Sequence, residues 1–467
     1  MREAVLAADT DRCVDACPAA RSRDVVVLAP GARYELDQGG LRIASVVVLQ
    51  GRGAVLAVAT GAPDRYTAPL LHVAATGRVR LTDLALTGSG STALLNDGVL
   101  VLRDVAVRGN EQGLDAGPGT AAGLTNRGRA SARRSTFADN QAPSGPAAIS
   151  NARGARLRLV HSTVSGNDGT FGPVPAVGNA GVLALHRTVV RDNDAGLVNE
   201  GTLVATRSAL RRTATTALLN HGHARLALVD LQANGLAVDN RGDLDVAYCW
   251  VRDGSGLRSD RGAGGMENSG DLRLRGSAVT GNSGGAAGGI RSSGNLELRD
   301  VTVAENRAGG FLDTSGDTSS NPDGAGGVSV VGGTAQLSGV TLARNAYETL
   351  PELPTPATVS GGLARLGGSL TVSGSVIAEN RSDRPVAAGG PDCTGEVRSL
   401  GHTLVQRTAG CAYAPGPGDL VRQDPRLGPL GRHGGPTLTL LPLDGSPLVD
   451  RGSPAPPGSG LPGACTA

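Results

Sequence analysis

The chain contains no lysine, so all 44 of its basic residues are arginines. This absence excludes Schiff-base chemistry and any lysine acting as a general base. Aromatic residues make up only 2% of the sequence, which argues weakly against an extended groove that stacks sugar rings or bases. We interpret the single tryptophan, Trp250, as a packing residue, because one indole has no partner for a stacking array.

Long apolar runs are also missing. No segment approaches the ~18 apolar residues of a membrane-spanning helix, and residues 1–9 lack the apolar core of a signal peptide. We therefore expect no transmembrane segment, and a chain that starts downstream of its export signal or at a misassigned start. The formal charge of +2 is small and charges look scattered, which argues against a nucleic-acid partner.

Six cysteines are too few and too dispersed for a zinc cluster. Cys393 and Cys411 bracket a turn segment, and we expect a disulfide between them rather than two buried thiols. The pairing of Cys13 with Cys17 stays open, and Cys249 has no evident mate.

The feature that the sequence does contain is a repeat. An Asn-x-Gly triplet recurs, and a second turn marker follows it after fourteen residues. The triplets begin at Asn96, Asn126, Asn179, Asn199, Asn220, Asn240 and Asn268, and the second markers are Asn110, Asn140, Asn193, Thr213, Asn234, Gly254 and Asn282. Asn151 reaches its partner Asn167 after sixteen residues. A constant segment between segments of free length indicates a solenoid.

Within each constant segment, apolar and polar residues alternate in two short stretches, as in β-strands. In the copy from Gly294 to Asn306 the parity changes at Asp300, which predicts a corner there. The expected inward set is Leu296, Leu298, Val301 and Val303, and the outward set is Glu297, Arg299, Thr302 and Ala304. We predict an all-β, right-handed single-stranded parallel β-helix of about 12 coils.

Asparagine and glycine at the corners have a physical explanation. We expect each asparagine to tolerate a left-handed backbone and to bond the equivalent asparagine one coil away. The glycine after it is expected to take a positive φ. Insertions leave from one edge, with the longest at 306–331 and 345–366, so these are the places to search for binding.

Three regions are expected along the chain. Residues 1–70 hold an N-terminal cap, with a helix at 2–9 and strands within 24–36, and the first coils. Residues 71–385 hold the β-helix repeats, and residues 386–467 form a C-terminal segment that caps the other end.

Both ends resemble known families. Met1-Arg-Glu-Ala, followed by Val-Val-Val-Leu-Ala-Pro-Gly-x-x-Tyr-x-Leu, resembles the opening of CSLREA-type secreted bacterial β-helix proteins. The C-terminal segment resembles a choice-of-anchor Q domain through Asp392-Cys393-Thr-Gly395, Ser399-Leu-Gly-His-Thr-Leu404, Gly434-Gly-Pro-Thr-Leu438 and Gly445-Ser-Pro-Leu-Val-Asp450. The resemblance implies a β-helix of the pectate-lyase-like superfamily that is exported to the cell surface or medium, with no known reaction.

Candidate catalytic residues do not form a recognisable constellation. A hydrolase of this superfamily needs paired carboxylates, and no Asp-Asp doublet occurs. Asn220-His221-Gly222-His223 occupies an ordinary turn slot, so we interpret it as structural. A lyase needs an arginine base, but the outward arginines lie on different coils and are interpreted as solvated surface: Arg103, Arg158, Arg187, Arg273 and Arg299.

Two insertions are candidate ligand sites. The first carries Asp313, Asp317, Asn321 and Asp323, whose hard oxygens suit calcium, yet it matches no EF-hand spacing and is interpreted as a polar loop. The second, from Ala346, contains three prolines and is interpreted as a spacer or contact ridge. The glycine-rich stretch 284–289 lacks the Gly-Lys-Ser/Thr of a phosphate loop.

These observations predict an exported surface or extracellular protein with a structural, adhesive or glycan-contacting role. The expected partner is a cell-surface or extracellular polysaccharide, or another surface protein. The alternative is a calcium-dependent polysaccharide lyase or glycoside hydrolase, which would gather several carboxylates and an arginine on one face. We assign no catalytic residue, cofactor-binding residue or metal ligand at this stage.

Overall fold

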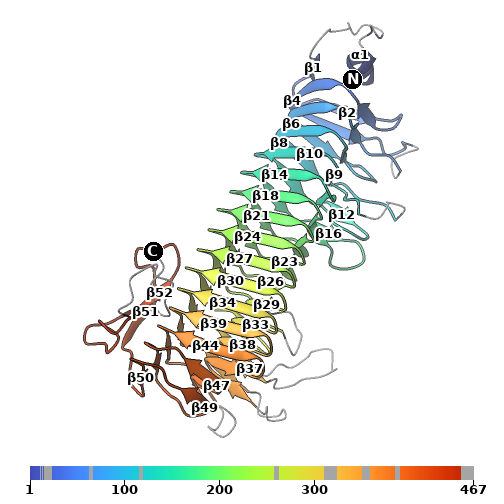
Figure 1. Ribbon diagram of the computed structural model, residues 1–467. Coiled ribbons are helices and arrows are strands. Elements are labelled where there is room, and N and C mark those ends of the chain that lie inside the picture. Colours follow the sequence, from blue (N-terminus) through green and yellow to red (C-terminus); the bar gives the residue numbers. More distant parts are fainter. Residues whose placement is uncertain are drawn as a thin grey trace. The chain divides into compact units, whose positions relative to one another are not determined.

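The computed structural model describes residues 1–10, 12, 14, 24–62, 67–114, 119–256, 262–309, 323–349, 358–383 and 390–453. The chain divides into two compact units, the first comprising Met1–Thr215 with His221–Ala224 and the second Thr216–Asn220 with Arg225–Ala467. Both units are built from coils of short parallel strands (Figure 1). The predicted parallel β-helix is confirmed.

Each full coil contributes three strands. In one coil of the first unit these are β9 (Leu124–Asn126), β10 (Arg129–Arg133) and β11 (Thr136–Ala138). They pair in parallel with the next coil's strands, β13 (Ile149–Asn151), β14 (Arg156–Val160) and β15 (Thr163–Ser165). We call the sheet that contains β9 and β13 the loop-side sheet, and the sheet that contains β10 and β14 the long-strand sheet.

The corners depend on residues with a left-handed backbone. Arg134 (φ 50°) separates β10 from β11, and Asp300 (φ 53°) forms the corner that the change of parity predicted. A second left-handed residue, such as Asp139 (φ 52°), directly precedes the second marker asparagine. The prediction that the asparagines themselves adopt this conformation is wrong, because none of the described marker asparagines has a positive φ.

The asparagines instead form two buried ladders of side-chain hydrogen bonds. Asn96 Nδ2 donates to Asn126 Oδ1 at 2.6 Å, and Asn126 Nδ2 donates to Asn151 Oδ1 at 2.8 Å. On the second ladder, Asn282 Nδ2 donates to Asn306 Oδ1, and Asn306 Nδ2 donates to Asn345 Oδ1, each at 2.9 Å. The predicted bonds between coils are therefore confirmed, and they satisfy amides that would otherwise be unpaired in the interior.

The glycine of the Asn-x-Gly triplet also has a different role from the one predicted. Gly128, Gly222 and Gly294 do not have a positive φ. A Cβ atom on any of them would lie 2.2 Å from the carbonyl oxygen of the corresponding glycine one coil earlier. Glycine is needed because the backbones of successive coils approach closely, and not because the turn is left-handed.

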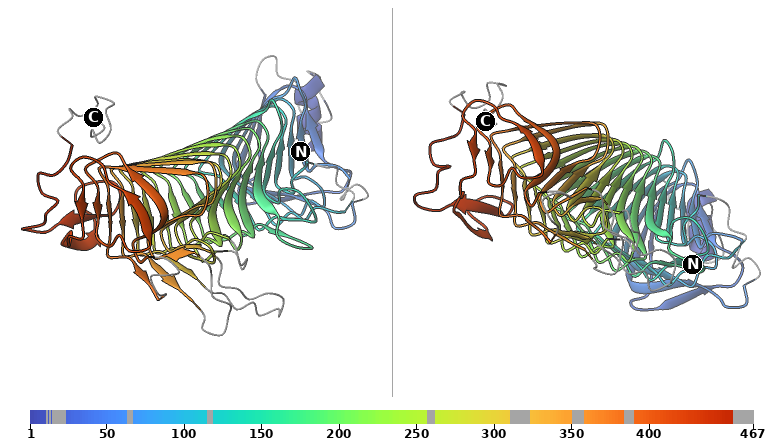
Figure 2. Two further views of the ribbon diagram at one scale, coloured as in Figure 1. Left: turned by 60° about the horizontal axis from the view of Figure 1, so that its bottom comes forward. Right: turned by 90° about the horizontal axis from the view of Figure 1, so that it is seen from below.

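The interior is filled by leucine and valine, including all four predicted inward residues of the copy at Gly294. Two outward residues, Thr302 and Ala304, are buried as well. The reason is an antiparallel hairpin of β51 (Leu427–Gly431) and β52 (Thr439–Pro442), which packs on the outer face of the second unit (Figure 2). Its Leu427 and Leu440 form a buried cluster with Ala304 and Ala343.

A helix closes the N-terminal end of the first unit. α1 (Arg2–Thr10) buries Val5, Ala7 and Ala8, as the predicted helical opening requires. The carboxylate of Asp9 fixes it in place by accepting hydrogen bonds from the backbone N–H groups of Ala44 and Ser45 at 2.9–3.0 Å. The helix thus covers the open end of the first coils.

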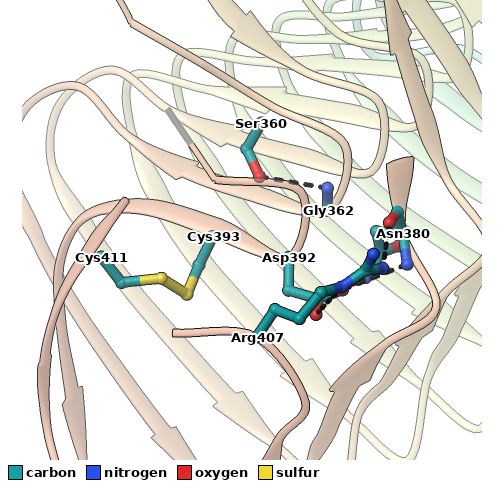
Figure 3. Close-up of a disulfide and its surroundings, with 7 residues drawn as sticks. All are labelled: Ser360, Gly362, Asn380, Asp392, Cys393, Arg407 and Cys411. Carbon is teal, nitrogen blue, oxygen red and sulfur yellow. Dashed lines mark hydrogen bonds and ion pairs between the residues drawn. A yellow bond between two sulfur atoms is a disulfide. The ribbon is translucent and has the colours of Figure 1, made fainter. Parts of the chain in front are cut away.

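The last coils of the second unit carry the predicted disulfide. It joins Cys393 of β47 (Cys393–Ser399) to Cys411 of β49 (Cys411–Ala414), whose Cα atoms lie 5.4 Å apart (Figure 3). Cys249 is a free, buried thiol. Cys13, Cys17 and Cys465 lie outside the described residues.

Candidate functional site

The loop-side sheet presents one outward side chain per coil, at the position just before the first ladder residue. In the second unit three consecutive coils place charged residues there: Asp239 in β26 (Leu236–Asn240), Glu267 in β29 (Met266–Asn268) and Arg291 in β33 (Ile290–Ser292). The parallel register sets them directly side by side. We call these three residues the acid–arginine row.

Glu267 and Arg291 form an ion pair in which both side chains are about three-quarters buried, with exposed fractions of 23% and 26%. Within the described part of the chain, Glu267 Oε2 and Arg291 Nε are shielded from solvent and have no hydrogen-bond partner. Asp239 is held beside them by Arg241, at 2.8 Å. A shielded acceptor and a shielded donor without partners are unusual in a folded protein, and a ligand that supplies the missing bonds would explain them.

The electrostatics of the row act on Glu267 in opposite directions. Burial raises the pKa of Glu267, Arg291 opposes that rise, and the neighbouring Asp239 adds to it. Beside Glu267, the fixed guanidinium of Arg291 can bind a carboxylate or a pair of hydroxyl groups.

The loops that border this sheet are partly ordered into a small sheet of their own. Its strands are β32 (Ser283–Gly284), β36 (Arg307–Gly309), β41 (Ala346–Glu348) and β46 (Arg381–Ser382). Tyr347 is fully buried there against Ala308 and Val359. The insertion that was predicted to be a spacer therefore begins as a buried strand, and the loop edge has a packed base.

Pairs of glycines let these loops stack. The pairs Gly264–Gly265, Gly288–Gly289, Gly326–Gly327 and Gly361–Gly362 belong to four consecutive coils. A Cβ on Gly288 would lie 2.4 Å from the carbonyl oxygen of Gly326. Close backbone packing thus accounts for the end of the 284–289 stretch.

Other residues considered from the sequence lie away from the row. Arg273 forms ion pairs with Asp243 at 2.7 Å and Asp245 at 3.4 Å, and Arg299 pairs with Glu297, all on exposed side chains. Their interpretation as solvated surface fits this geometry. Arg103 lies 3.6 Å from Asp104. The expectation of scattered charge is wrong in the first unit, where Arg158 and Arg187 belong to a cluster described below.

In the described residues, neither the Asn220–His223 turn nor the loop that contains Asp323 brings catalytic or metal-binding side chains together. Asn220 is a ladder residue that donates to Asn240 at 2.8 Å, and His221 and His223 are exposed. Asp323 Oδ1 accepts a hydrogen bond from the Thr358 N–H at 2.7 Å, while Asp313 and Asp317 lie outside the described residues. Within the described ranges no three His, Cys, Asp or Glu side chains are grouped as metal ligands.

Trp250 lies beside two guanidinium groups. Those of Arg252 and Arg432 are 4.3 Å and 5.5 Å from its ring centroid, and its Nε1 donates to Thr280 Oγ1 at 3.0 Å. Arg432 belongs to the segment between β51 and β52, so the indole helps to hold the C-terminal hairpin. The packing interpretation of Trp250 agrees with these contacts.

The acid–arginine row was missed in the sequence, although a signal for it exists. The residue before the first ladder position is uncharged at Leu95, Thr125, Ser150, Gly178 and Val198, and then charged at Asp239, Glu267 and Arg291. An alignment of the repeats on the asparagine ladder would have shown this change.

Compared by sequence, the chain matches no described protein family and no curated protein. Among solved structures it is similar to the periplasmic alginate epimerase AlgG, over 85% of this chain and 84% of that one, at 13% identity and a TM-score of 0.38. The mannuronan C-5 epimerase AlgE4 A-module of Azotobacter vinelandii is similar over 86% and 89%, at 13% identity and a TM-score of 0.25.

The tailspike protein of E. coli bacteriophage HK620, as a mutant in complex with a pentasaccharide, is similar over 85% of this chain and 72% of that one, at 11% identity and a TM-score of 0.25. At these values the likenesses carry no argument about function. In the part of the chain that the structure describes, no helix is both long and apolar enough to cross a membrane.

Proposed function

We propose that this protein is an exported surface or extracellular β-helix that contacts a glycan through the acid–arginine row, in an adhesive or structural role. The observation that carries the proposal is the Glu267–Arg291 pair, with one shielded acceptor and one shielded donor left without partners among the described residues. Sugar hydroxyl groups both donate and accept hydrogen bonds, so a saccharide lying across the row can satisfy both atoms.

Two further observations support the proposal. The described ends of the loop-side insertions form a packed base, in which Tyr347 is buried against Ala308 and Val359. The terminal motifs resemble CSLREA-type and choice-of-anchor Q proteins, and this resemblance favours export to the surface or medium.

The test is binding to an array of neutral and acidic glycans, followed by titration of the strongest ligand. Glu267→Gln and Arg291→Gln should each weaken that binding by about tenfold, since each removes one charge-assisted hydrogen bond. The matched control is Glu297→Gln and Arg299→Gln, an exposed ion pair on the long-strand sheet, and should change it less than about twofold. Equal losses in both pairs would refute a specific role for the row.

Catalysis of the calcium-dependent lyase or hydrolase kind is the second candidate, and the raised pKa of Glu267 beside Arg291 favours it. Polyuronates should be incubated with the protein, with calcium and with a chelator, while ultraviolet absorbance follows any unsaturated product. A rise that Glu267→Gln abolishes would establish a lyase, and no turnover would leave the binding role.

A further inference from the structure

Arginines cover the outer face of the long-strand sheet in the first unit. We call this surface the basic face, and its members are Arg78, Arg80, Arg129, Arg133, Arg156, Arg158, Arg187 and Arg207. All eight are exposed, and none has an ion-pair partner among the described residues. The acidic residues at left-handed corners of these coils are Asp83, Asp104, Asp139 and Asp192. Asp104 is already bonded to Arg134 and Asp192 to Arg212, each at 2.6 Å.

The register places like charges next to each other. Arg129 lies directly opposite Arg156 on the adjacent strand, and Arg103 lies opposite Arg133. Adjacent strands are about 4.8 Å apart, and like charges directly opposite one another are destabilising. The corner continues the pattern, because Arg187 and Arg207 follow His161 on successive coils.

The same sheet in the second unit shows that the fold does not require this arrangement. There Asp245 lies opposite Arg273, and Arg273 lies opposite Glu297. Ion pairs at 2.7–3.4 Å join Arg273 to Asp243 and Asp245. Arginines on this sheet can therefore be paired with acidic residues of adjacent strands, as in the second unit. The arginines of the basic face in the first unit are not paired in this way.

We propose that the basic face binds a linear anionic polysaccharide whose carboxylate groups lie along successive coils. Guanidinium groups bind carboxylates through two parallel hydrogen bonds, and arginines on several coils suit a polymer that carries a series of charges. The described outward positions of this face carry no Trp, Tyr or Phe, so bases of a single-stranded nucleic acid would find no stacking platform. The face belongs to a different unit from the acid–arginine row, and the inference needs no part of the function proposed for that row.

The test uses the full chain with three probes: polygalacturonate, random-sequence double-stranded DNA and neutral dextran. The variant Arg129→Gln/Arg156→Gln/Arg158→Gln removes three charges from the basic face. The control Arg225→Gln/Arg275→Gln/Arg398→Gln removes three charges from exposed positions in the second unit, so that both proteins have the same net charge. Dissociation constants are measured at low and at physiological salt.

We expect polygalacturonate to bind the wild type, the basic-face variant to lose at least about tenfold in affinity, and the control to lose less than about twofold. Repeating the measurements with Glu267→Gln added to each protein separates the face from the acid–arginine row. Equal losses in variant and control, or no binding at low salt, would overturn the proposal. Tighter binding of DNA than of polygalacturonate would overturn it in favour of a nucleic-acid surface, and binding of dextran would show that charge is not the cause.

The variant should also fold, because it removes repulsion between opposed arginines. Its thermal midpoint should equal or exceed that of the wild type, measured by circular dichroism. A variant that unfolds would be replaced by Arg158→Gln/Arg187→Gln, which leaves the opposed pair Arg129 and Arg156 intact and should still weaken the binding of polygalacturonate. Unchanged affinity in that second variant would count against the proposal.

Discussion

The buried carboxylate of Asp392 ends the second asparagine ladder and receives Arg407 from outside it (Figure 3). Its Oδ1 accepts hydrogen bonds from Asn380 Nδ2 at 3.0 Å and Asn380 N at 3.1 Å, and its Oδ2 lies 3.2 Å from Arg407 Nε. An aspartate thus stands where the next coil would have supplied an asparagine. It is the first residue of the C-terminal motif that resembles choice-of-anchor Q proteins.

Asp392 should make stability depend on pH. Burial raises its pKa above the ordinary value, although Arg407 and Asn380 oppose the rise. The folded state therefore binds this proton more tightly than the unfolded state, and the stability contributed by Asp392 falls as pH rises from about 4 through the raised pKa. Chemical denaturation should show that the free energy of unfolding of the wild type, relative to that of Asp392→Asn, decreases as pH rises across this range. A difference that grows with pH would mean that Arg407 outweighs burial.

A break in the middle of a ladder should cost more than the loss of an exposed amide. Asn306→Ala removes the acceptor shared by Asn282 N and Nδ2, and it removes the side-chain donor to the Val279 carbonyl and to Asn345 Oδ1, which keeps only the backbone N–H of residue 306. We expect unfolding to become easier by about 3 kcal/mol, because buried polar groups stay unsatisfied. Asn295→Ala, which loses exposed bonds to Asp271 and Thr334, should change stability by less than about 0.5 kcal/mol in the same denaturation experiment. Equal effects would contradict the ladder's role.

The glycine pairs of the loop edge should not tolerate even a methyl group. Gly288→Ala would place Cβ 2.4 Å from the Gly326 carbonyl oxygen, so the coils must separate. We expect a loss of about 1–3 kcal/mol, as for other overpacked sites, measured by thermal unfolding. Gly435→Ala is the control, since no atom lies within 4 Å of its Cβ. Equal midpoints of thermal unfolding for the two variants would contradict this explanation.

Cys249 should react only when the second unit opens. Burial raises the pKa of its thiol to about 12, so almost no reactive thiolate exists near neutral pH. In native buffer its alkylation, followed by mass spectrometry of the peptide that contains it, should be at least about a hundredfold slower than in denaturant. Rapid labelling of the native protein would show that this coil opens locally.

His186 should titrate below the usual histidine range. Loss of solvation lowers its pKa first, and Arg187, His161, Arg207 and Arg158 lower it further. Arg187→Gln should raise that pKa part of the way back, as followed by NMR of the imidazole protons. Arg153→Gln, on an exposed turn outside the sheet, serves as the control and should leave it unchanged.

The fold followed from the sequence because its determinants repeat at a constant distance. Asn268 and Asn282 mark one coil, and the strands, the corner and the ladder contacts lie between such markers. The conformations assigned to those markers were wrong, since hydrogen bonding and close backbone approach require Asn and Gly there, whereas Asp139 or Arg134 takes the left-handed turn.

The candidate sites could not be predicted in the same way. Residues that are neighbours across coils are separated in the sequence by loops of variable length. Arg129 lies opposite Arg156 on the adjacent strand, and Glu267 lies opposite Arg291, but the number of residues between the partners differs in the two pairs. The burial of Thr302 was also invisible, because it depends on a hairpin that begins at Leu427. Local periodicity says nothing about either kind of contact.

The ladders have one more property, which is direction. The amides from Asn96 to Asn126 and from Asn282 to Asn380 point their NH2 groups toward the C-terminal neighbour and their oxygens toward the preceding coil. Such aligned dipoles polarise one another, as in any chain of hydrogen bonds. The row of amides therefore has a net dipole whose positive end lies at Asn380. A negative charge at Asp392 is favourable at that end.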